Sequence, residues 1–363
     1  MGFNCGIVGL PNVGKSTIFN AMTSAGAEAA NYPFCTIEPN TGIVSVPDER
    51  LNILSKIGKS EKTIPTAIEF VDIAGLVRGA SSGEGLGNQF LGHIRSVDAI
   101  IHVVRCFEDE NVTHVEGNID PKRDVELIET ELLLSDLSSV EKRLDRSLKL
   151  AKAGNKEAKE ESDSLVLAKG YLEAGTMIST IKDQEIIERI KPLGLITSKP
   201  IVFVANVAES EVNNPNAYAL TLKSLADERG AGFVFLSGQV ESEISILPEA
   251  ERKEFLEALD IKESGLQKLA KAGYEALNLI TYFTCGPKET RAWTVRIGTN
   301  APDAAGEIHS DFTKGFIRAE VIAYDDYVSA GGETKAKEQG KLRSEGKTYI
   351  VQDGDVMHFR FNV

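Results

Sequence analysis

The sequence has few cysteines, few histidines and no long apolar run, and each absence excludes a class of protein. Four cysteines are scattered over 363 residues without a C-x-x-C pair, so neither a disulfide framework nor a zinc site is predicted. The five histidines show no metal-ligand spacing. No apolar stretch approaches the ~20 residues that span a bilayer, and the N-terminus enters a predicted strand at once. We therefore expect a cytoplasmic protein with no membrane partner.

The chain also lacks an excess of positive charge. Lys and Arg number 40 against 54 Asp and Glu, which gives a formal net charge of −14. This balance argues against non-specific coating of nucleic acid, although it leaves room for a local cationic face. The content of 42% hydrophobic and 26% charged residues is ordinary for a globular protein. A length of 363 residues predicts two or three domains.

The first motif is Gly-Leu-Pro-Asn-Val-Gly-Lys-Ser at residues 9–16, which matches G-x-x-x-x-G-K-[ST]. In this pattern, backbone N–H groups surround phosphate oxygens, Lys15 supplies a positive charge to the β- and γ-phosphates, and the Ser16 hydroxyl ligates Mg²⁺. A chance match in a glycine-rich turn is the alternative. It is disfavoured because residues 3–8 read as a buried strand and residues 17–22 as the start of a helix. The motif predicts binding of a nucleoside triphosphate.

The pattern around this loop predicts an interrupted α/β sheet. Short β-branched segments with few charges alternate with helical stretches, as in sheets covered by helices on both faces. The strand-like segments are residues 3–8, 67–71, 99–104, 200–205 and 232–236. The long gap between the third and fourth segments indicates an insertion.

The insertion, from about residue 121 to 191, is charged, leucine-rich and poor in strand formers. Apolar residues recur at steps of three and four on both sides of Gly154 and Asn155, which together favour a helix stop and reversal. This pattern predicts an antiparallel helical hairpin, or short coiled coil. The first apolar stripe consists of Leu133, Leu137, Val140, Leu144, Leu148 and Ala151, and the returning stripe of Ala158, Leu165, Ala168 and Leu172.

The outward positions of the hairpin are rich in cations. A solvated helix face is the simple interpretation, and an arm that contacts a polyanion is the alternative. The cations are Lys142, Arg143, Arg146, Lys149, Lys152, Lys156 and Lys159.

The chain becomes β-rich after about residue 280, which predicts a separate small sheet with one helix near residues 304–313. We expect strands at residues 280–284, 291–296, 316–324 and 349–352. Basic residues of this region could flank, with the hairpin, a groove suited to RNA. They are Lys288, Arg291, Arg296, Lys314, Arg318, Lys341, Arg343 and Lys347. Its aromatic residues are expected to be core rather than platforms for bases.

Four further motifs follow in order along the chain. A loop at residues 31–36 ends in Thr36, which can complete a Mg²⁺ shell. Asp72 opens an Asp-Ile-Ala-Gly motif at a strand end, where it can bind Mg²⁺ through water. Asn206-Val-Ala-Glu209 and a Ser-Gly-Gln motif at Ser237 each follow a strand, where base-contacting loops belong. This order is that of a translation-factor-type GTPase domain.

The motifs at residues 9–17, 31–36, 72–79 and 83–88 resemble the Obg group of P-loop proteins, and Asn206-Val-Ala-Glu209 narrows the resemblance to its YchF subfamily. The resemblance implies a Ras-like sheet with helices on both faces, an inserted helical hairpin and a C-terminal β-grasp, TGS-like α+β domain. The implied domains are 1–121 with 199–277, 122–198, and 278–363.

The resemblance also implies an ATPase that associates with the ribosome, at its large subunit or through RNA, using the cationic hairpin and the C-terminal domain. Ser16 and Thr36 would hold Mg²⁺. The residues implied to contact ATP are Asn12, Val13, Gly14, Lys15, Ser16 and Thr17.

The base-reading motif departs from the guanine reader Asn-Lys-x-Asp at two positions. Val207 stands where the Lys stem packs on the base, and Glu209 is one methylene longer than Asp, which misplaces a bidentate acceptor. Lost or misaligned buried hydrogen bonds forfeit discrimination. We therefore expect a preference for ATP over GTP, with Asn206 and Val207 near the base. The alternative is that Glu209 reaches guanine after a small backbone shift.

The sequence lacks the glutamine that positions the attacking water in Ras-like proteins, because Leu76 occupies that position. Slow intrinsic hydrolysis is expected. Asn12 stands where related GTPases use an Asn to help bind K⁺, so stimulation by K⁺ is a hypothesis. His114, in a polar loop after a strand, is the candidate for orienting water, against the simpler interpretation of a solvated histidine.

The glycine-rich segment at residues 79–87 is expected to act as a switch that responds to the γ-phosphate. Cys35 stands beside Thr36, so its oxidation could disturb Mg²⁺ binding, although a quiet buried thiol is the simpler interpretation. Three functions remain open on the sequence: a ribosome-associated ATPase switch, a GTPase with the same fold, and a nucleotide-gated RNA- or protein-binding scaffold with incidental hydrolysis.

Overall fold

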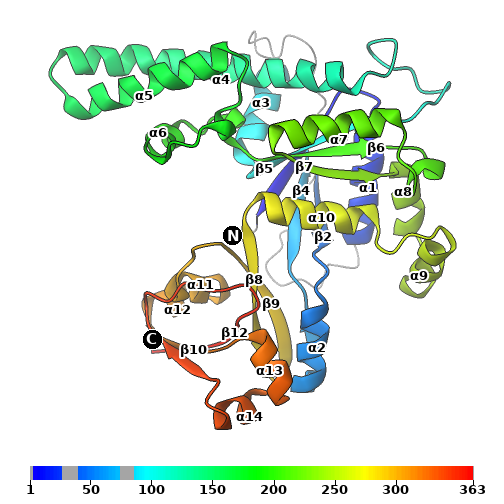
Figure 1. Ribbon diagram of the computed structural model, residues 1–363, viewed down its shortest axis with the longest axis vertical. Helices are drawn as coiled ribbons and strands as arrows, with labels where there is room; N and C mark the ends of the chain where they lie inside the picture. The colour runs from blue at the N-terminus through cyan, green and yellow to red at the C-terminus, as the bar shows by residue number, and fades with distance from the viewer. Residues whose placement is uncertain (1–2, 27–39, 74–85, 363) are drawn as a thin grey trace.

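The computed structural model describes residues 3–26, 40–73 and 86–362 and contains two six-stranded sheets (Figure 1). The first has the order β2-β4-β1-β5-β6-β7, with β2 antiparallel to β4 and parallel pairing elsewhere. Its strands are β1 Asn4–Val8, β2 Thr41–Ser45, β4 Ala67–Asp72, β5 Ala99–Arg105, β6 Ile201–Asn206 and β7 Gly232–Leu236. Every residue of β5 is buried, as expected for a central strand covered on both faces.

Helices pack on both faces of this sheet, so the expected Ras-like architecture is confirmed. In Figure 1, α7 lies over one face and α10 over the other. The core joins Ile18 and Met22 of α1 to Leu269 of α10, and a second cluster joins Leu222 of α7 to Val240 of α8. The helices are α1 Lys15–Gly26, α3 Leu86–Ser96, α7 Ala217–Arg229, α8 Gly238–Ser245, α9 Glu249–Ala258 and α10 Gly265–Ala276.

The expected helical hairpin is present as a long arm (Figure 1). Helix α4 (Pro121–Lys152) begins with an Asp120 cap, whose side chain accepts a hydrogen bond from the Arg123 N–H, and with proline at its first position. Asn155 caps the returning helix α5 (Lys156–Glu173) through the Ala158 N–H. Short helices then lead back to the sheet: η3 Ile178–Thr180, α6 Gln184–Ile190, η4 Lys191–Leu193 and η5 Ile196–Ser198.

Two details of the hairpin differ from expectation. The first half of α4 belongs to the sheet, because Val125, Ile128 and Leu132 are buried in the sheet's cores; only its second half forms the arm. Near the tip, Leu148 is 40% exposed while Ser147 is buried and donates a hydrogen bond to Glu161. The apolar stripe therefore ends before the tip, since helix periodicity drifts away from a fixed contact line.

The second sheet has the order β11-β10-β12-β8-β9-β3 and confirms a separate C-terminal α+β region. The expected strand at residues 349–352 is wrong: Ile350 makes only an isolated bridge to Asn300, and the strand is β12, further along the chain. The strands are β3 Lys62–Ile64, β8 Leu279–Cys285, β9 Glu289–Arg296, β10 Phe316–Ile322, β11 Arg343–Glu345 and β12 Val356–Phe361. The helices are α11 Ala301–Ile308, α12 Ser310–Lys314, α13 Tyr324–Ala330 and α14 Glu333–Glu338.

Residues 49–64 join this second sheet, which corrects their assignment to the nucleotide-binding domain. Strand β3 pairs in parallel with β9, and helix α2 (Glu49–Gly58) buries Leu51 and Leu54 against Phe283 and Tyr327. The sequence pattern carried no warning, because a three-residue strand without apolar alternation has almost no signal. The side chain of Arg50 also attaches α2 to the C-terminal region, because it binds the carboxylates of Asp48 and Asp353 at 2.7 and 2.6 Å.

The described helices include none that is long and apolar enough to cross a bilayer.

We predict that Leu54→Ala lowers the free energy of unfolding by about 2–5 kcal/mol, because it leaves a cavity at the junction of α2 and the second sheet. Urea denaturation measures the loss. The matched control is Ile53→Ala on the same helix, where the side chain is 39% exposed and little should change. Equal losses in both variants would contradict this packing.

Candidate nucleotide-binding site

The loop between β1 and α1 can adopt its path only because of its glycines. A Cβ at Gly9 would lie 2.4 Å from the Val103 carbonyl oxygen. A Cβ at Gly14, whose φ is +95°, would lie 2.1 Å from the Asn206 side-chain nitrogen. Asn12 also has a positive φ, of 62°, and its side chain donates a hydrogen bond to the Thr113 carbonyl at 3.2 Å. The neighbouring strands thus fix the loop's shape before any ligand binds.

Lys15 is a buried cation at the start of α1, with 8% of its surface exposed. Its Nζ donates to the Leu10 carbonyl oxygen at 2.6 Å. Burial lowers the pKa of Lys15 to about 8, and the Asp72 carboxylate opposes that shift. Burial in turn raises the pKa of Asp72, against the opposing effect of Lys15. A cation held away from water at a helix N-terminus is suited to an anionic ligand such as a phosphate.

The exposed hydroxyls of Ser16 and Thr17 lie in the first turn of the same helix. The Ser16 hydroxyl and the Asp72 carboxylate, from the end of β4, form an oxygen donor set that fits Mg²⁺. Thr36, the third expected metal residue, lies outside the described residues, as do Cys35 and most of the glycine-rich segment at residues 79–87. The structure therefore describes two of the three expected ligands.

Asn206 connects the phosphate loop to the loop before α8. Its side-chain nitrogen donates to the Val13 carbonyl at 2.9 Å, and its side-chain oxygen accepts from the Gly238 N–H at 2.9 Å. Both ends of the amide are therefore committed to the backbone, and the residue is only 4% exposed. Asn206 acts here as a brace that positions the surrounding loops.

The other residues of the base loop (residues 206–209) and of the loop at Ser237 have different surroundings. Val207 is 2% exposed and packs in the core cluster under α7 and α8, so its side chain does not form an open platform. Glu209 is exposed at the start of the short helix η6 (Glu209–Glu211). Ser237 is buried and caps α8 by accepting from the Val240 N–H at 3.5 Å. The exposed carboxylate of Glu209 thus differs sharply from the buried Val207 and Ser237.

His114 is buried, contrary to the simple interpretation of a solvated loop histidine. It is 6% exposed, and its Nε2 lies 2.9 Å from an Asp124 carboxylate oxygen. Its Nδ1 accepts a hydrogen bond from the Glu116 N–H at 3.1 Å, so Nδ1 carries no proton and Nε2 donates to Asp124. Both ring nitrogens are occupied. The adjacent Thr113 contacts Asn12, which places the histidine's loop directly against the phosphate loop.

Arg105 is a residue that sequence reasoning missed. It ends β5, is 2% exposed, and donates to the carbonyl oxygens of Phe107, Asp109 and Val112 at 3.1, 3.2 and 2.8 Å. These bonds fold the loop that carries His114. The available signal was an arginine that ends a strand whose other residues, apart from His102, are apolar.

Two family models match the chain. One is described as 50S ribosome-binding GTPase and matches residues 4–136; the other, YchF-GTPase_C, is described as a protein of unknown function and matches residues 279–362. A curated relative from Haemophilus ducreyi, named ribosome-binding ATPase YchF, is 57% identical over 364 residues and all of both chains. The protein of that name from Bacillus subtilis is 54% identical over 366 residues, again covering both chains in full.

The chain belongs to the YchF family. A solved structure of the YchF GTPase from Schizosaccharomyces pombe agrees, with a TM-score of 0.90 and 40% identity over 99% of this chain and 98% of that one. The names of these YchF proteins disagree about the nucleotide, since the curated relatives are called ATPases and the Schizosaccharomyces pombe protein a GTPase. The geometry of the base loop is therefore the informative feature.

We predict that Gly14→Ala weakens binding of adenosine triphosphate at least about tenfold, because the new Cβ would clash with Asn206 at a positive φ. Isothermal titration calorimetry measures the affinity. Gly170→Ala in α5 is the matched control, since nothing lies within 4 Å of a Cβ there. An unchanged affinity in Gly14→Ala would show that the brace does not set the loop's shape.

Proposed function

We propose that this chain is a P-loop ATPase that hydrolyses ATP with Mg²⁺ and associates with the ribosome. The observation that carries the proposal is the phosphate loop, in which buried Lys15 opens α1 opposite Asp72. Membership of the YchF family and the names of the curated relatives support it. A ribosomal partner also favours the cytoplasm as the location.

In this proposal, residues 12–17 contact the triphosphate. Lys15 neutralises the β- and γ-phosphates, and the N–H groups of the loop and the first turn of α1 bind phosphate oxygens. Ser16 and Thr36 would hold Mg²⁺ directly, and Asp72 would hold it through water. When bound, the metal supplies charge neutralisation on the transferred phosphoryl group. The protein residues supply position and a site partly shielded from water.

The base loop supports ATP over GTP. A guanine reader needs a carboxylate at a fixed distance and a Lys stem over the base. Here Val207 is packed into the core, and Glu209 places its carboxylate one methylene further out. Asn206 and Ser237 would position the loops beside the base rather than contact the base with their side chains. A GTPase remains the second candidate, favoured by the intact Asn206 brace and by the name of the Schizosaccharomyces pombe relative.

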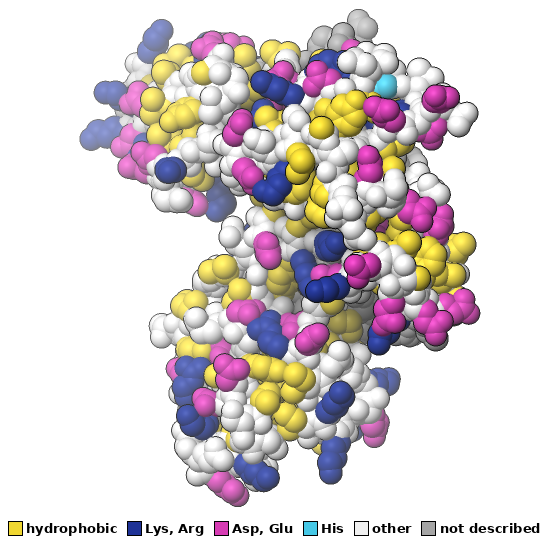
Figure 2. All heavy atoms as spheres, turned by 45° about the vertical axis from the view of Figure 1, so that its right-hand side comes forward, with side chains coloured by type: hydrophobic (Ala, Val, Ile, Leu, Met, Phe, Trp, Pro, Cys, Tyr) yellow, Lys and Arg dark blue, Asp and Glu magenta, His cyan; other side chains and the backbone are white. Residues whose placement is uncertain are grey.

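The end of the helical arm is the proposed ribosome contact. Figure 2 shows several Lys and Arg side chains there, at its upper left, with Asp and Glu side chains between them. Lys149, Lys152 and Lys156 are exposed, whereas Arg143 is exposed but paired with Glu161 at 2.7 Å. A cationic tip on a net acidic protein presents ribosomal RNA with a local site while the body is repelled. The same proposal places the contact on the large ribosomal subunit and includes the C-terminal domain as a second contacting region.

We predict that the chain hydrolyses ATP at least about tenfold faster than GTP at subsaturating nucleotide, because the base loop lacks a guanine reader. We also predict that ribosomes stimulate turnover. Phosphate release, measured with each nucleotide and with or without ribosomes, tests both expectations. A tenfold preference for GTP would reject the assignment.

The triple variant Lys149→Glu, Lys152→Glu, Lys156→Glu tests whether the arm contacts the ribosome. It should retain basal hydrolysis, because these residues lie on exposed helix ends far along the chain from the phosphate loop. Sedimentation with ribosomes should weaken in this variant and fall steeply with salt in the parent. An affinity for ribosomes that does not change with salt concentration would exclude a phosphate-dominated contact.

His114 is the proposed water-orienting residue, since Leu76 at the glutamine position can neither donate nor accept a hydrogen bond. Both of its ring nitrogens are engaged, so catalysis requires the loop held by Arg105 to move or the Asp124 bond to break. Its proximity to Asn12, through Thr113, makes that movement sensitive to the phosphate loop. Asn12 is also the proposed K⁺ contact, and faster turnover in K⁺ than in Na⁺ is expected.

We predict that His114→Ala lowers kcat by about 10²-fold while the affinity for ATP stays within about twofold, because the imidazole acts only in the hydrolytic step. Single-turnover hydrolysis and equilibrium binding separate the two quantities. His309→Ala, at an exposed site in the C-terminal region, is the matched control. If turnover in His114→Ala equalled that of the parent, another group must orient the water.

A further inference from the structure

The second sheet opens between two of its central strands. Strands β8 and β12 are neighbours, yet they pair at one position, Val356 with Phe283, where the Phe283 N–H donates to the Asp355 carbonyl at 2.8 Å. Beyond it, β12 continues to residue 361 paired with β10 alone, and β8 continues to residue 285 paired with β9. A cavity of about 430 Å³ lies at this opening. This size is within the range of ligand pockets.

The opening exposes a strand edge inside the sheet. Backbone N–H and C=O groups alternate in direction along a strand. Because the Asp355 carbonyl faces β8, the backbone groups of Phe359 and Phe361 face the same side. The described strands give these groups no partner on that side. An unpaired edge of this kind is a template for pairing with another extended chain.

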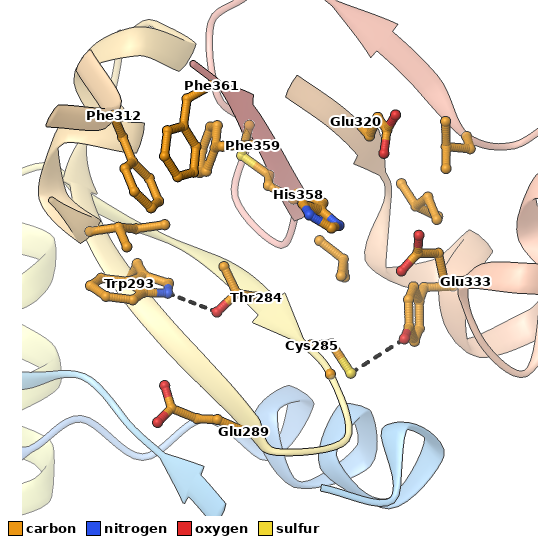
Figure 3. A pocket seen from close by; sticks show the side chains of 17 residues that line it. Thr284, Cys285, Glu289, Trp293, Phe312, Glu320, Glu333, His358, Phe359 and Phe361 are labelled. Carbon is orange, nitrogen blue, oxygen red and sulfur yellow. Dashed lines mark hydrogen bonds between the residues drawn. The ribbon is translucent and has the colours of Figure 1, made fainter. Parts of the chain in front are cut away.

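One wall of the cleft is aromatic. Trp293, Phe312 and Phe361 lie together on that side in Figure 3. The rings of Phe312 and Phe361 are stacked with centroids 3.7 Å apart, and Phe361 is 40% exposed. The Trp293 indole donates to the Thr284 hydroxyl at 3.0 Å, which fixes the orientation of its ring. This wall favours apolar side chains.

The opposite wall is acidic. Ligand atoms of Glu320, Glu333 and His358 lie within 4.8 Å of one another, and Figure 3 shows the three side chains on the side away from Trp293. Arg318 and Arg360 bind the Glu320 carboxylate at 3.1 and 2.9 Å. These guanidinium groups disfavour a metal ion at Glu320.

Glu333, by contrast, is exposed and makes no ion pair with any described residue. Glu289 is likewise without an ion pair in the described part of the chain and lies at the foot of the cleft in Figure 3. Two carboxylates that make no ion pair with a described residue, beside an apolar cleft, favour a cationic ligand and oppose an RNA backbone.

We propose that this cleft binds an extended peptide segment of alternating apolar and basic residues, which adds to the open edge of β12. Side chains of a strand alternate between two faces. A chain beside β12 therefore places every second residue against Phe361 and Trp293, and the residues between them toward Glu333. The alternation of the peptide matches the two unlike walls. The site lies in the second sheet and does not depend on the proposed ATPase activity.

The probe is an acetylated, amidated heptapeptide of alternating Val or Ile and Lys or Arg. Trp293 is the only tryptophan of the chain and lines the cleft, so its fluorescence reports binding there without a label. We expect a saturable change on titration of the full chain, together with slower hydrogen exchange at the amides of Phe359 and Phe361. A peptide N-methylated at the backbone positions that face β12 should bind at least about tenfold more weakly, because it lacks the donors for pairing.

Two variants separate the site from general electrostatics. Glu333→Lys should weaken the peptide roughly three- to tenfold, since it reverses a charge on the acidic wall. Glu338→Lys makes the same charge change on the same helix, α14, but does not line the cleft, and should stay within about twofold of the parent.

Four outcomes would overturn the proposal. The first is no saturable fluorescence change, and the second is equal binding of the N-methylated peptide, which would exclude strand addition. The third is equal weakening by Glu333→Lys and Glu338→Lys. The fourth is displacement of the peptide by polyuridine RNA or by Zn²⁺ alone, which would assign the cleft to RNA or to a metal ion.

Discussion

The structure around the phosphate loop depends on the side-chain amide of Asn206. It binds the Val13 carbonyl with its nitrogen and the Gly238 N–H with its oxygen, so one buried residue joins the loop after β1 to the loop after β7. The contact is possible only because Gly14 has no Cβ. Buried amides that satisfy backbone groups on both sides lose much if either partner is removed, since the other is left unpaired. The same side chain therefore sets both the path of the phosphate loop and the position of the base loop.

Two continuous segments connect the first sheet to the rest of the molecule. Helix α4 runs without a break from Pro121, past Val125 in the core of the first sheet, to the tip of the arm, so the sheet and the arm share one helix. Residues 49–64 leave the first sheet and complete the second, where Arg50 binds Asp353. The guanidinium of Arg95 on α3 adds a further contact to the arm through Ser139, at 2.9 Å. The nucleotide site, the arm and the second sheet therefore share elements rather than being joined by linkers.

How much of the candidate site was predictable varies with the kind of residue. Gly14 and Lys15 belong to a contiguous motif whose spacing is set by backbone geometry, so sequence placed them at a strand-to-helix turn, as found. Asn206 was placed correctly at a strand end, but its role as a brace depends on Val13 and Gly238, which are distant in sequence. The burial of His114 came from Asp124 and was invisible, because a histidine in a polar stretch looks solvated until its partner is known.

The sequence by itself determined the phosphate loop, the five mutually parallel strands of the first sheet and the helical reversal at Gly154, because each depends on residues adjacent in the chain or at a fixed period. It did not indicate the antiparallel edge strand β2. Only the tertiary structure decided that β3 joins the second sheet and that β12 separates from β8 after Val356. Pairing between distant strands depends on the packing of whole elements, and the sequence of a short strand has too little periodicity to predict its partner. Local patterns fix elements, whereas the partners of those elements are set by the burial that the complete fold achieves.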